Sequence, residues 1–175
     1  MSQTVILSKN EIQHVLEQLA LEIAGRHPNY DNLVFIGIRR RGVDIARRIA
    51  NLIYKKSGVN IPLGELDINL YRDDWTKSNI KPVMGHSQIP VNLDDKIVIL
   101  FDDVLFSGRT VRAALEAIFD YGRPQKVELL VLIDRGHREL PIAADYIGVQ
   151  FDTLKDSRVD VFLEERDEKD LVVII

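Results

Sequence analysis

The sequence predicts an α/β fold in which a mostly parallel β-sheet is covered by helices on both faces. Short, continuous apolar runs at 32–38, 96–101 and 127–133 are typical of parallel strands that are buried on both faces. Helical segments of about 12 residues alternate with these runs, as in βαβ architectures. Charged residues follow all three runs, at 39–41, 102–103 and 134–135. Because ligands bind beyond the carboxyl ends of strands in such sheets, we expect these charges to meet in one crevice.

The composition is that of an ordinary globular domain. Of the 175 residues, 46% are hydrophobic and 29% are charged, and the net charge of −4 gives no indication of nucleic-acid binding. No cysteine is present, which excludes disulfides, thiolate metal ligands and a cysteine nucleophile. No apolar stretch approaches the roughly 20 residues needed to span a bilayer, and the first residues lack the pattern of a secretory signal. We therefore expect a single cytoplasmic domain over residues 1–175.

The first half of the chain is predicted to contain two helices and two strands. Ser8 and Glu11 form a capping-box pattern in front of apolar residues at helical spacing, so a helix begins after Ser8. Gly25 or Pro28 marks the end of this helix. The elements that follow are a strand at 32–38, a helix at 43–54 and an alternating strand at 63–71.

The second half begins after a long polar segment at 72–95. Loops of this length inside a compact domain are usually functional. Gly122 and Pro124 close the helix that is predicted at 110–121. The remaining predicted strands are 96–101, 127–133 and the short apolar runs 144–148, 159–163 and 171–175.

The stretch DDVLFSGRT, which follows the third strand, suits a phosphorylated ribose. Gly108 before a helix makes a nest of backbone N–H groups that binds anions, and the hydroxyls of Ser107 and Thr110 add donors. Asp102 and Asp103 cannot bind the same phosphate because like charges repel, but they can accept hydrogen bonds from ribose hydroxyls or face a hydrated Mg²⁺. The simpler interpretation is that Asp103 caps the helix and Asp102 is a solvated strand end.

A second basic element lies at 39–42, where three arginines precede a glycine. Successive N–H groups at a helix start, together with guanidinium forks, suit a diphosphate. The alternative is a solvated basic turn. Taken together, the two elements describe a ribose 5-phosphate that also carries pyrophosphate.

The stretch 98–110 resembles the phosphoribosyl-pyrophosphate (PRPP) motif of type I phosphoribosyltransferases. Further stretches resemble a more specific family, the bifunctional pyrimidine operon regulators and uracil phosphoribosyltransferases called PyrR. The resemblance covers nearly the whole chain, and DRGHRELPI with LYRDD is its most specific part. The stretches are GIRRRG (37–42), LYRDD (70–74), DDVLFSGRTVRAAL (102–115), GRP (122–124), DRGHRELPI (134–142) and DYIG (145–148).

The resemblance implies the type I phosphoribosyltransferase fold, with a small hood built largely from about 140–175 and a flexible lid at 71–95. It places Asp102 and Asp103 on the ribose hydroxyls as catalytic residues, with Arg72 near the lid hinge as a third. The other implied contacts are Arg40 and Arg41 with the pyrophosphate; Val104, Leu105, Phe106, Ser107, Gly108, Arg109 and Thr110 with the 5-phosphate; and Arg135 and Val159 with the nucleotide or base. Mg²⁺ is expected to enter with PRPP, without a direct protein ligand.

The implied reaction is the displacement of pyrophosphate from PRPP by N1 of uracil, which yields UMP. The alternative is a hypoxanthine-guanine phosphoribosyltransferase. Those enzymes usually carry an acidic residue at the motif position that Phe106 occupies here. Because Phe106 cannot exchange a proton with a purine ring nitrogen, the motif favours a pyrimidine. A third hypothesis, a PRPP-binding fold that has lost its activities and serves as a partner module, is disfavoured by the intact acidic and basic motifs.

The resemblance also implies a UMP-sensing regulator that binds leader mRNA, in a homodimer or homotetramer. RNA affinity comes largely from phosphate neutralisation, so the expected surface is basic. Ala143 and Val149 stand where RNA-binding members tend to carry basic residues, which removes charge from this surface. For His137, a structural role that holds the turn competes with an RNA contact. The basic residues that remain as candidates are Arg26, His27, His137, Arg138 and Lys155.

Overall fold

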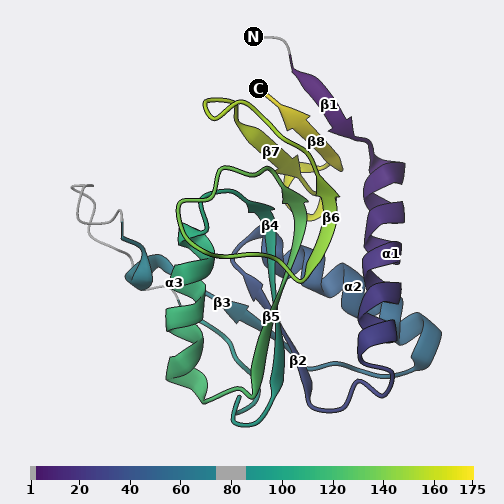
Figure 1. The fold of residues 1–175 in the computed structure, drawn as a ribbon. Helices are drawn as coiled ribbons and strands as arrows, with labels where there is room; N and C mark the ends of the chain where they lie inside the picture. Colours follow the sequence, from purple (N-terminus) through teal and green to yellow (C-terminus); the bar gives the residue numbers. More distant parts are fainter. Residues whose placement is uncertain (1–2, 74–85) are drawn as a thin grey trace.

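A computed structural model describes residues 3–73 and 86–175, which form two β-sheets (Figure 1). The main sheet has the strand order β3-β2-β4-β5-β6, and all of its neighbouring strands pair in parallel. The small sheet has the order β1-β8-β7 and is antiparallel. The strands are β1 (Thr4–Leu7), β2 (Leu33–Ile38), β3 (Leu63–Leu66), β4 (Ile97–Leu105), β5 (Lys126–Asp134), β6 (Tyr146–Gln150), β7 (Val159–Phe162) and β8 (Leu171–Ile174). The helices are α1 (Lys9–Arg26), α2 (Arg41–Ser57), α3 (Arg109–Ile118) and the short α4 (Glu164–Asp167).

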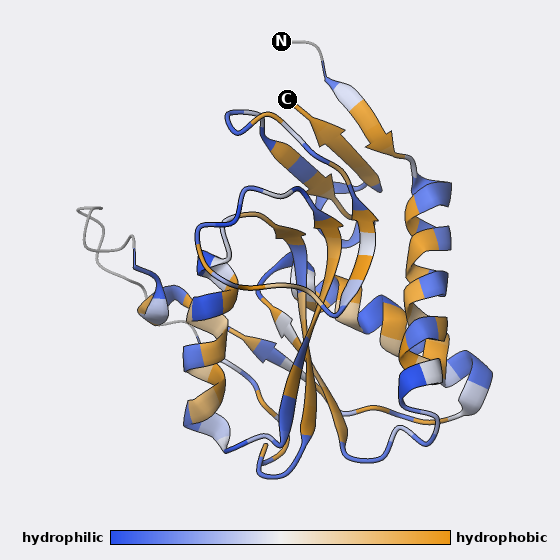
Figure 2. Ribbon diagram, viewed as in Figure 1, coloured by the Kyte–Doolittle hydropathy of each residue, from blue (hydrophilic) through white to orange (hydrophobic). Residues whose placement is uncertain are grey.

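The predicted α/β architecture is confirmed, because helices cover both faces of the main sheet. Alternate residues of a strand point to opposite faces. Phe35 and Phe101 lie in the core cluster under α1 and α2, with ring centroids 4.7 Å apart. Val34 and Leu100, their chain neighbours, belong to the cluster under α3. Figure 2 shows hydrophobic residues along the central strands and on the sides of the helices that face them.

The ends of the two long helices, α1 and α2, are set by particular residues. The capping box of α1 is confirmed, since the backbone N–H of Ser8 donates to the Glu11 carboxylate at 2.8 Å. Helix α2 begins at Arg41, two residues earlier than predicted, because Gly42 lets the helix start against β4. A Cβ at Gly42 would lie 2.2 Å from the Phe101 carbonyl oxygen. The helix ends at Gly58, whose left-handed φ of 71° suits glycine.

Two predicted strands have different ends. The strand predicted at 63–71 stops at Leu66 and gives way to a 3₁₀ turn, η1 (Asn69–Tyr71). Strand β4 continues to Leu105. Asp102 and Asp103 therefore lie within the last residues of β4 that pair with β5, rather than beyond the end of the strand. The 3₁₀ helix η3 (Phe119–Tyr121) completes the helix that was predicted to end near 121.

The hood was expected largely at about 140–175, a range that contains β7 and β8 of the small sheet. Strand β6 lies after residue 140 but pairs in parallel with β5, so it belongs to the main sheet. The small sheet instead recruits the N-terminal strand β1, which pairs with β8. This sheet lies beyond the carboxyl ends of the main strands (Figure 1).

The predicted lid at 71–95 is only partly described. Residues 74–85 lie outside the described residues. The chain is described again from His86, and Gln88 forms an antiparallel bridge with Glu65 on the edge strand β3. Within the described ranges no helix is long and apolar enough to cross a membrane.

Candidate active site

The carboxyl ends of β2 and β4 open onto a crevice of about 490 Å³. Three groups of charges were expected to meet in one crevice. Those at the carboxyl ends of β2 and β4 do meet there, whereas Asp134 and Arg135, at the end of β5, do not line it. The expected site residues that line the crevice are Arg40, Arg41, Arg72, Asp102, Asp103, Val104 and Thr110. An adjoining hollow is lined by Ser107 and Arg109, together with Arg72, Asp73 and Thr110. The structure therefore brings the acidic pair, the basic turn and the 107–110 stretch to one place.

Asp102 and Asp103 form a carboxyl pair at the floor of this crevice. Asp102 is only 6% exposed, and its Oδ1 accepts the backbone N–H of Asp103 at 3.0 Å. Burial, reinforced by the neighbouring Asp103 charge, raises the pKa of Asp102 well above its usual value. Burial also raises the pKa of Asp103, against the opposing effect of hydrogen bonding from Asp102 and of the Arg41 charge. Ligand hydroxyls or a cation at this position would relieve the cost of the buried charge.

The loop after β4 turns its carbonyl groups away from the crevice. The Leu105 carbonyl accepts the N–H of Arg135 at 3.1 Å, and the Ser107 carbonyl accepts the N–H of Glu139 at 2.9 Å. Between them, the Phe106 carbonyl accepts a bond from the Arg138 side chain at 3.0 Å. All three carbonyls therefore point toward the segment after β5.

The N–H groups of the same peptides consequently point the other way. In a planar trans peptide, the C=O of one residue and the N–H of the next are antiparallel. The N–H groups of Phe106, Ser107 and Gly108 must therefore face away from the segment after β5, and among the described residues they have no hydrogen-bond acceptor. Three unpaired N–H groups ahead of the α3 N-terminus form an anion-binding nest. Gly108, at a φ of 91°, supplies the left-handed turn that this loop requires.

The basic turn presents an unsatisfied donor. Arg41 donates from Nη2 to Asp167 at 3.2 Å, so α4 holds its guanidinium in place. Its Nε is buried, and it has no hydrogen-bond partner within the part of the chain that the structure describes. Because buried donors are normally paired, an anionic ligand of this crevice is the natural acceptor. The neighbouring Arg39 is bound to Glu65 at 3.1 Å.

Arg109 is bound by two carboxylates in this structure. Its Nε donates to Glu139 at 2.8 Å and its Nη1 donates to Asp73 at 2.7 Å, and these contacts raise the pKa of Arg109. Half of its side chain remains exposed. A phosphate in the adjoining hollow would compete with these carboxylates for the same guanidinium.

Arg135 and Val159 lie outside the set of residues that line the crevice. The Arg135 guanidinium lies 4.2 Å from the centroid of the Phe106 ring and donates to Thr153 Oγ1 at 3.0 Å and to the Leu154 carbonyl at 3.0 Å. It therefore connects the loop after β4 to the 151–156 loop. Val159, on β7, is buried in the core that the small sheet shares with α1 and α2.

Most of the expected RNA-binding residues have intramolecular partners. Arg26 pairs with Glu22 and lies over the Tyr146 ring, and Nε2 of His27 is 2.9 Å from the buried Glu128 carboxylate. His137 is exposed, and its Nε2 lies 2.6 Å from the Thr153 carbonyl oxygen, which agrees with the structural alternative for this residue. Arg138 is half-buried against the loop after β4, whereas Lys155 is exposed.

Two polar residues just after β3 were missed from the sequence. Asp67 and Asn69 follow β3 and line the same crevice as the acidic pair of β4. The alternation at 63–71 suggested a continuing strand, but the chain turns here because Asp67 Oδ1 accepts the N–H of Asn69 at 2.9 Å. The Asp-x-Asn pattern is typical of such turns and was the available signal.

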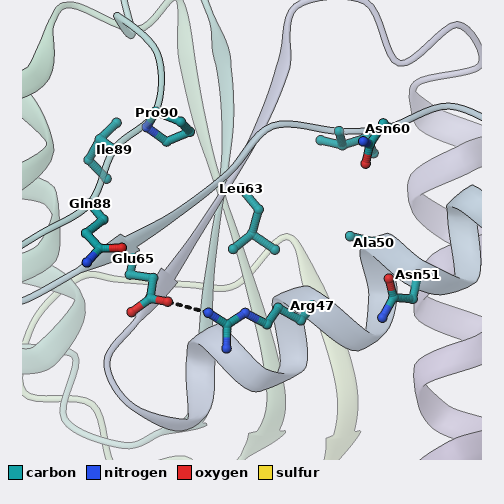
Figure 3. A pocket seen from close by; sticks show the side chains of 10 residues that line it. Arg47, Ala50, Asn51, Asn60, Leu63, Glu65, Gln88, Ile89 and Pro90 are labelled. Atoms are coloured by element: carbon teal, nitrogen blue, oxygen red, sulfur yellow. Dashed lines mark hydrogen bonds and ion pairs between the residues drawn. The ribbon is translucent and has the colours of Figure 1, made fainter.

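A second hollow of about 540 Å³ lies between α2, β3 and the 88–90 segment (Figure 3). Arg47 and Glu65 point toward each other across its floor, and Asn51 and Asn60 line its far side. It is slightly larger than the crevice, but it contains neither the carboxyl pair nor the unpaired N–H groups. The chemistry therefore belongs to the smaller crevice.

Comparison with known structures identifies the fold. A hypoxanthine-guanine phosphoribosyltransferase from Bacillus anthracis superposes with a TM-score of 0.74 at 18% identity, covering 100% of this chain and 99% of that one. A hypoxanthine phosphoribosyltransferase from Trypanosoma cruzi gives a TM-score of 0.75 at 18% identity, covering 98% and 94%. At this identity the likeness concerns the fold alone.

Sequence comparison identifies the family. Residues 2–168 match the phosphoribosyl transferase domain family. A protein of Desulfosudis oleivorans named "Bifunctional protein PyrR" is 54% identical over 173 residues, 98% of this chain and 96% of its own length. One of the same name from Bacillus cereus is 48% identical over 174 residues, 98% and 97% of the two chains. The chain therefore belongs to the phosphoribosyl transferase domain family and, within it, to the family of bifunctional PyrR proteins.

Proposed function

We propose that this protein is a uracil phosphoribosyltransferase that converts uracil and PRPP to UMP and pyrophosphate, and that it senses UMP to regulate transcription of pyrimidine biosynthesis genes. The observation that carries the enzymatic half is the juxtaposition of three unpaired N–H groups with the Asp102–Asp103 pair. It offers hydroxyl acceptors in the crevice and a phosphate site at the hollow that adjoins it. The family name of the relatives supports both halves.

Each part of PRPP has a counterpart in the crevice. The 5-phosphate lies against the N–H groups of Phe106, Ser107 and Gly108, and displaces carboxylates from Arg109. The ribose hydroxyls donate to Asp102 and Asp103. Pyrophosphate accepts from the free Nε of Arg41.

This arrangement catalyses the reaction by positioning and charge stabilisation. The bond from ribose C1 to pyrophosphate oxygen breaks as the bond to uracil N1 forms, and the N1 proton passes to the departing pyrophosphate or to water. Positive charge that develops on the ribose is stabilised by the carboxyl pair beneath it, and the guanidinium of Arg41 stabilises the negative charge of the departing pyrophosphate. No covalent nucleophile is required.

Two adjacent carboxyl groups, the buried one of Asp102 and the half-buried one of Asp103, also fit Mg²⁺, which prefers oxygen ligands. Among the described residues there is no cluster of three or more His, Cys, Asp or Glu that could hold a metal ion. We therefore propose that Mg²⁺ arrives with PRPP and that Asp102 and Asp103 face its hydration shell. When bound, it neutralises charge on the pyrophosphate.

A pyrimidine substrate is favoured over a purine. Phe106 stands at the motif position where purine transferases usually carry an acid, and the Arg135 guanidinium covers its ring. No proton-exchanging carboxylate is available at this position to assist a purine ring nitrogen. The purine-transferase structures share the fold at 18% identity, which carries no information on the base.

The regulatory half rests on the family and on the exposed side chain of Lys155. We propose that the UMP-bound protein, as a homodimer or homotetramer, binds leader mRNA through a surface that includes Lys155. Arg26, His27 and Arg138 are engaged within the chain, so their contribution to RNA affinity is indirect. RNA affinity that rises with UMP and falls steeply with salt is the expected behaviour. A flat salt response would remove this half of the proposal.

The direct test is product formation from PRPP and Mg²⁺ with uracil, hypoxanthine and guanine in parallel assays. We expect UMP from uracil and no nucleotide from either purine. Turnover of a purine would contradict the assignment of the base. Nucleotide binding without turnover of any base would leave a sensor and reject the enzyme.

A further inference from the structure

We propose that Arg138 is a positioning residue for the phosphate loop, Phe106–Ser107–Gly108, and that it acts through the Phe106 carbonyl rather than by contact with a ligand. This inference rests on the proposed function, because it concerns the loop that we assign to the 5-phosphate. It gives a role to a side chain that sequence analysis placed on an RNA-binding surface.

The Arg138 guanidinium donates most of its hydrogen bonds to backbone carbonyls. Nη1 donates to the carbonyls of Phe106 at 3.0 Å and Gly136 at 3.3 Å, and Nε donates to the Ile142 carbonyl at 3.0 Å. Nη2 pairs at 2.5 Å with the buried carboxylate of Asp134. The side chain is 24% exposed. A guanidinium that donates to three carbonyls and one carboxylate is held in one orientation.

Arg138 supplies a bond that no backbone group supplies. The carbonyls of Leu105 and Ser107 are held by backbone N–H groups, which any residue would provide. The carbonyl between them is held by the Arg138 side chain. A rotation of the Phe106–Ser107 peptide would turn that carbonyl toward the crevice and remove the Ser107 N–H from the anion nest. Arg138 therefore prevents a change that would place a partial negative charge where the phosphate binds.

The surroundings of the loop reinforce this function. A Cβ at Gly108 would meet Ile142 at 3.3 Å and Leu140 at 3.5 Å, so the segment after Arg138 packs directly beneath the loop. On the other side, Arg135 covers the Phe106 ring. Arg138 thus belongs to a support that fixes the loop before any phosphate arrives, which is the condition for strong electrostatic stabilisation.

The experiment compares Arg138→Gln, Arg138→Lys and the control Arg123→Gln in steady-state assays with PRPP and uracil. Arg123 is exposed and lies before β5, at the end of the sheet opposite the crevice. For Arg138→Gln we expect the KM for PRPP to rise about tenfold or more, with the KM for uracil unchanged. Arg138→Lys should not restore the KM for PRPP, because one ammonium nitrogen cannot reach the separate acceptors that Nε, Nη1 and Nη2 of Arg138 now bond. Arg123→Gln should match the wild type.

A second readout separates this inference from the proposed reaction. Calorimetric titration measures the affinity of the phosphate loop for ribose 5-phosphate without any turnover. It therefore remains informative if uracil is not the substrate. We expect weaker binding in both Arg138 variants, each of which is first shown to be folded by its thermal transition. If Arg138→Gln does not fold, Arg138→Lys carries the test. Wild-type affinity for both PRPP and ribose 5-phosphate in the folded variants would overturn the proposal, as would full restoration by lysine, since that would assign Arg138 a purely electrostatic role.

Discussion

Burial and the adjacent Asp103 charge raise the pKa of Asp102, and this shift affects the stability of the protein. A carboxyl group whose folded-state pKa exceeds its unfolded value binds more protons in the folded state. The stability that it contributes is present at pH values below about 4, the unfolded pKa, and is lost as the pH rises through the folded pKa. At neutral pH the raised pKa of Asp102 therefore lowers the free energy of unfolding. A residue that opposes folding and lines the crevice is placed there for binding.

Asp102→Asn should therefore make the protein more stable and less active at neutral pH. The amide oxygen can still accept the N–H of Asp103, while the buried charge is removed. We expect a Tm at pH 7 that is higher than that of the wild type by about 2–4 °C, and a difference that shrinks toward pH 4. Thermal denaturation across this pH range measures it. A lower Tm at pH 7 would mean that the carboxylate is compensated in the folded protein.

At the scale of elements, the position of the basic turn depends on how closely α2 approaches β4. Gly42 is buried at this contact, and a Cβ there would lie 2.2 Å from the Phe101 carbonyl oxygen. The atoms that such a Cβ would clash with all belong to the backbone of β4. The clash could therefore be removed only by a shift of the helix or of the strand. Because Arg41 begins the same helix, such a shift would also move its guanidinium relative to the carboxyl pair.

Gly42→Ala is accordingly expected to destabilise the fold by about 2–4 kcal/mol and to weaken PRPP binding. The matched control is Gly25→Ala, near the end of α1, where a Cβ would meet no atom within 4 Å. This control should be neutral or should stabilise by about 0.5–1 kcal/mol, since alanine favours a helix. Urea denaturation of both variants measures the difference. Equal stability of the two variants would show that the close contact is not maintained.

At the scale of the whole molecule, the main sheet was predictable and the small sheet was not. Runs such as 127–133 are apolar on both faces, and that pattern exists only because helices cover both sides of a parallel sheet. By contrast, β1 has four residues, and its partner β8 lies at the other end of the chain. Nothing local in so short a segment indicates that pairing, and nothing local separates β6, a main-sheet strand, from β7.

The site shows the same division between local and distant information. Asp102, Asp103 and Gly108 were predictable because their chemistry follows from chain neighbours at the end of one strand. The contact of Arg138 with Phe106 joins residues 32 positions apart, and that of Asp167 with Arg41 joins residues 126 apart. Such partners are set by the packing of the segment after β5 against the loop after β4 and of α4 against α2, which the sequence pattern does not describe.

The most direct test of the central claim is the rate of UMP formation by the double variant Asp102→Asn with Asp103→Asn, compared with the wild type at saturating uracil. The claim is that this crevice binds the ribose of PRPP through the carboxyl pair. It predicts a fall in kcat/KM for PRPP of about a thousandfold, equivalent to several kcal/mol of transition-state stabilisation, in a variant that remains folded. Wild-type turnover by the double variant would contradict the claim and would place the ribose elsewhere.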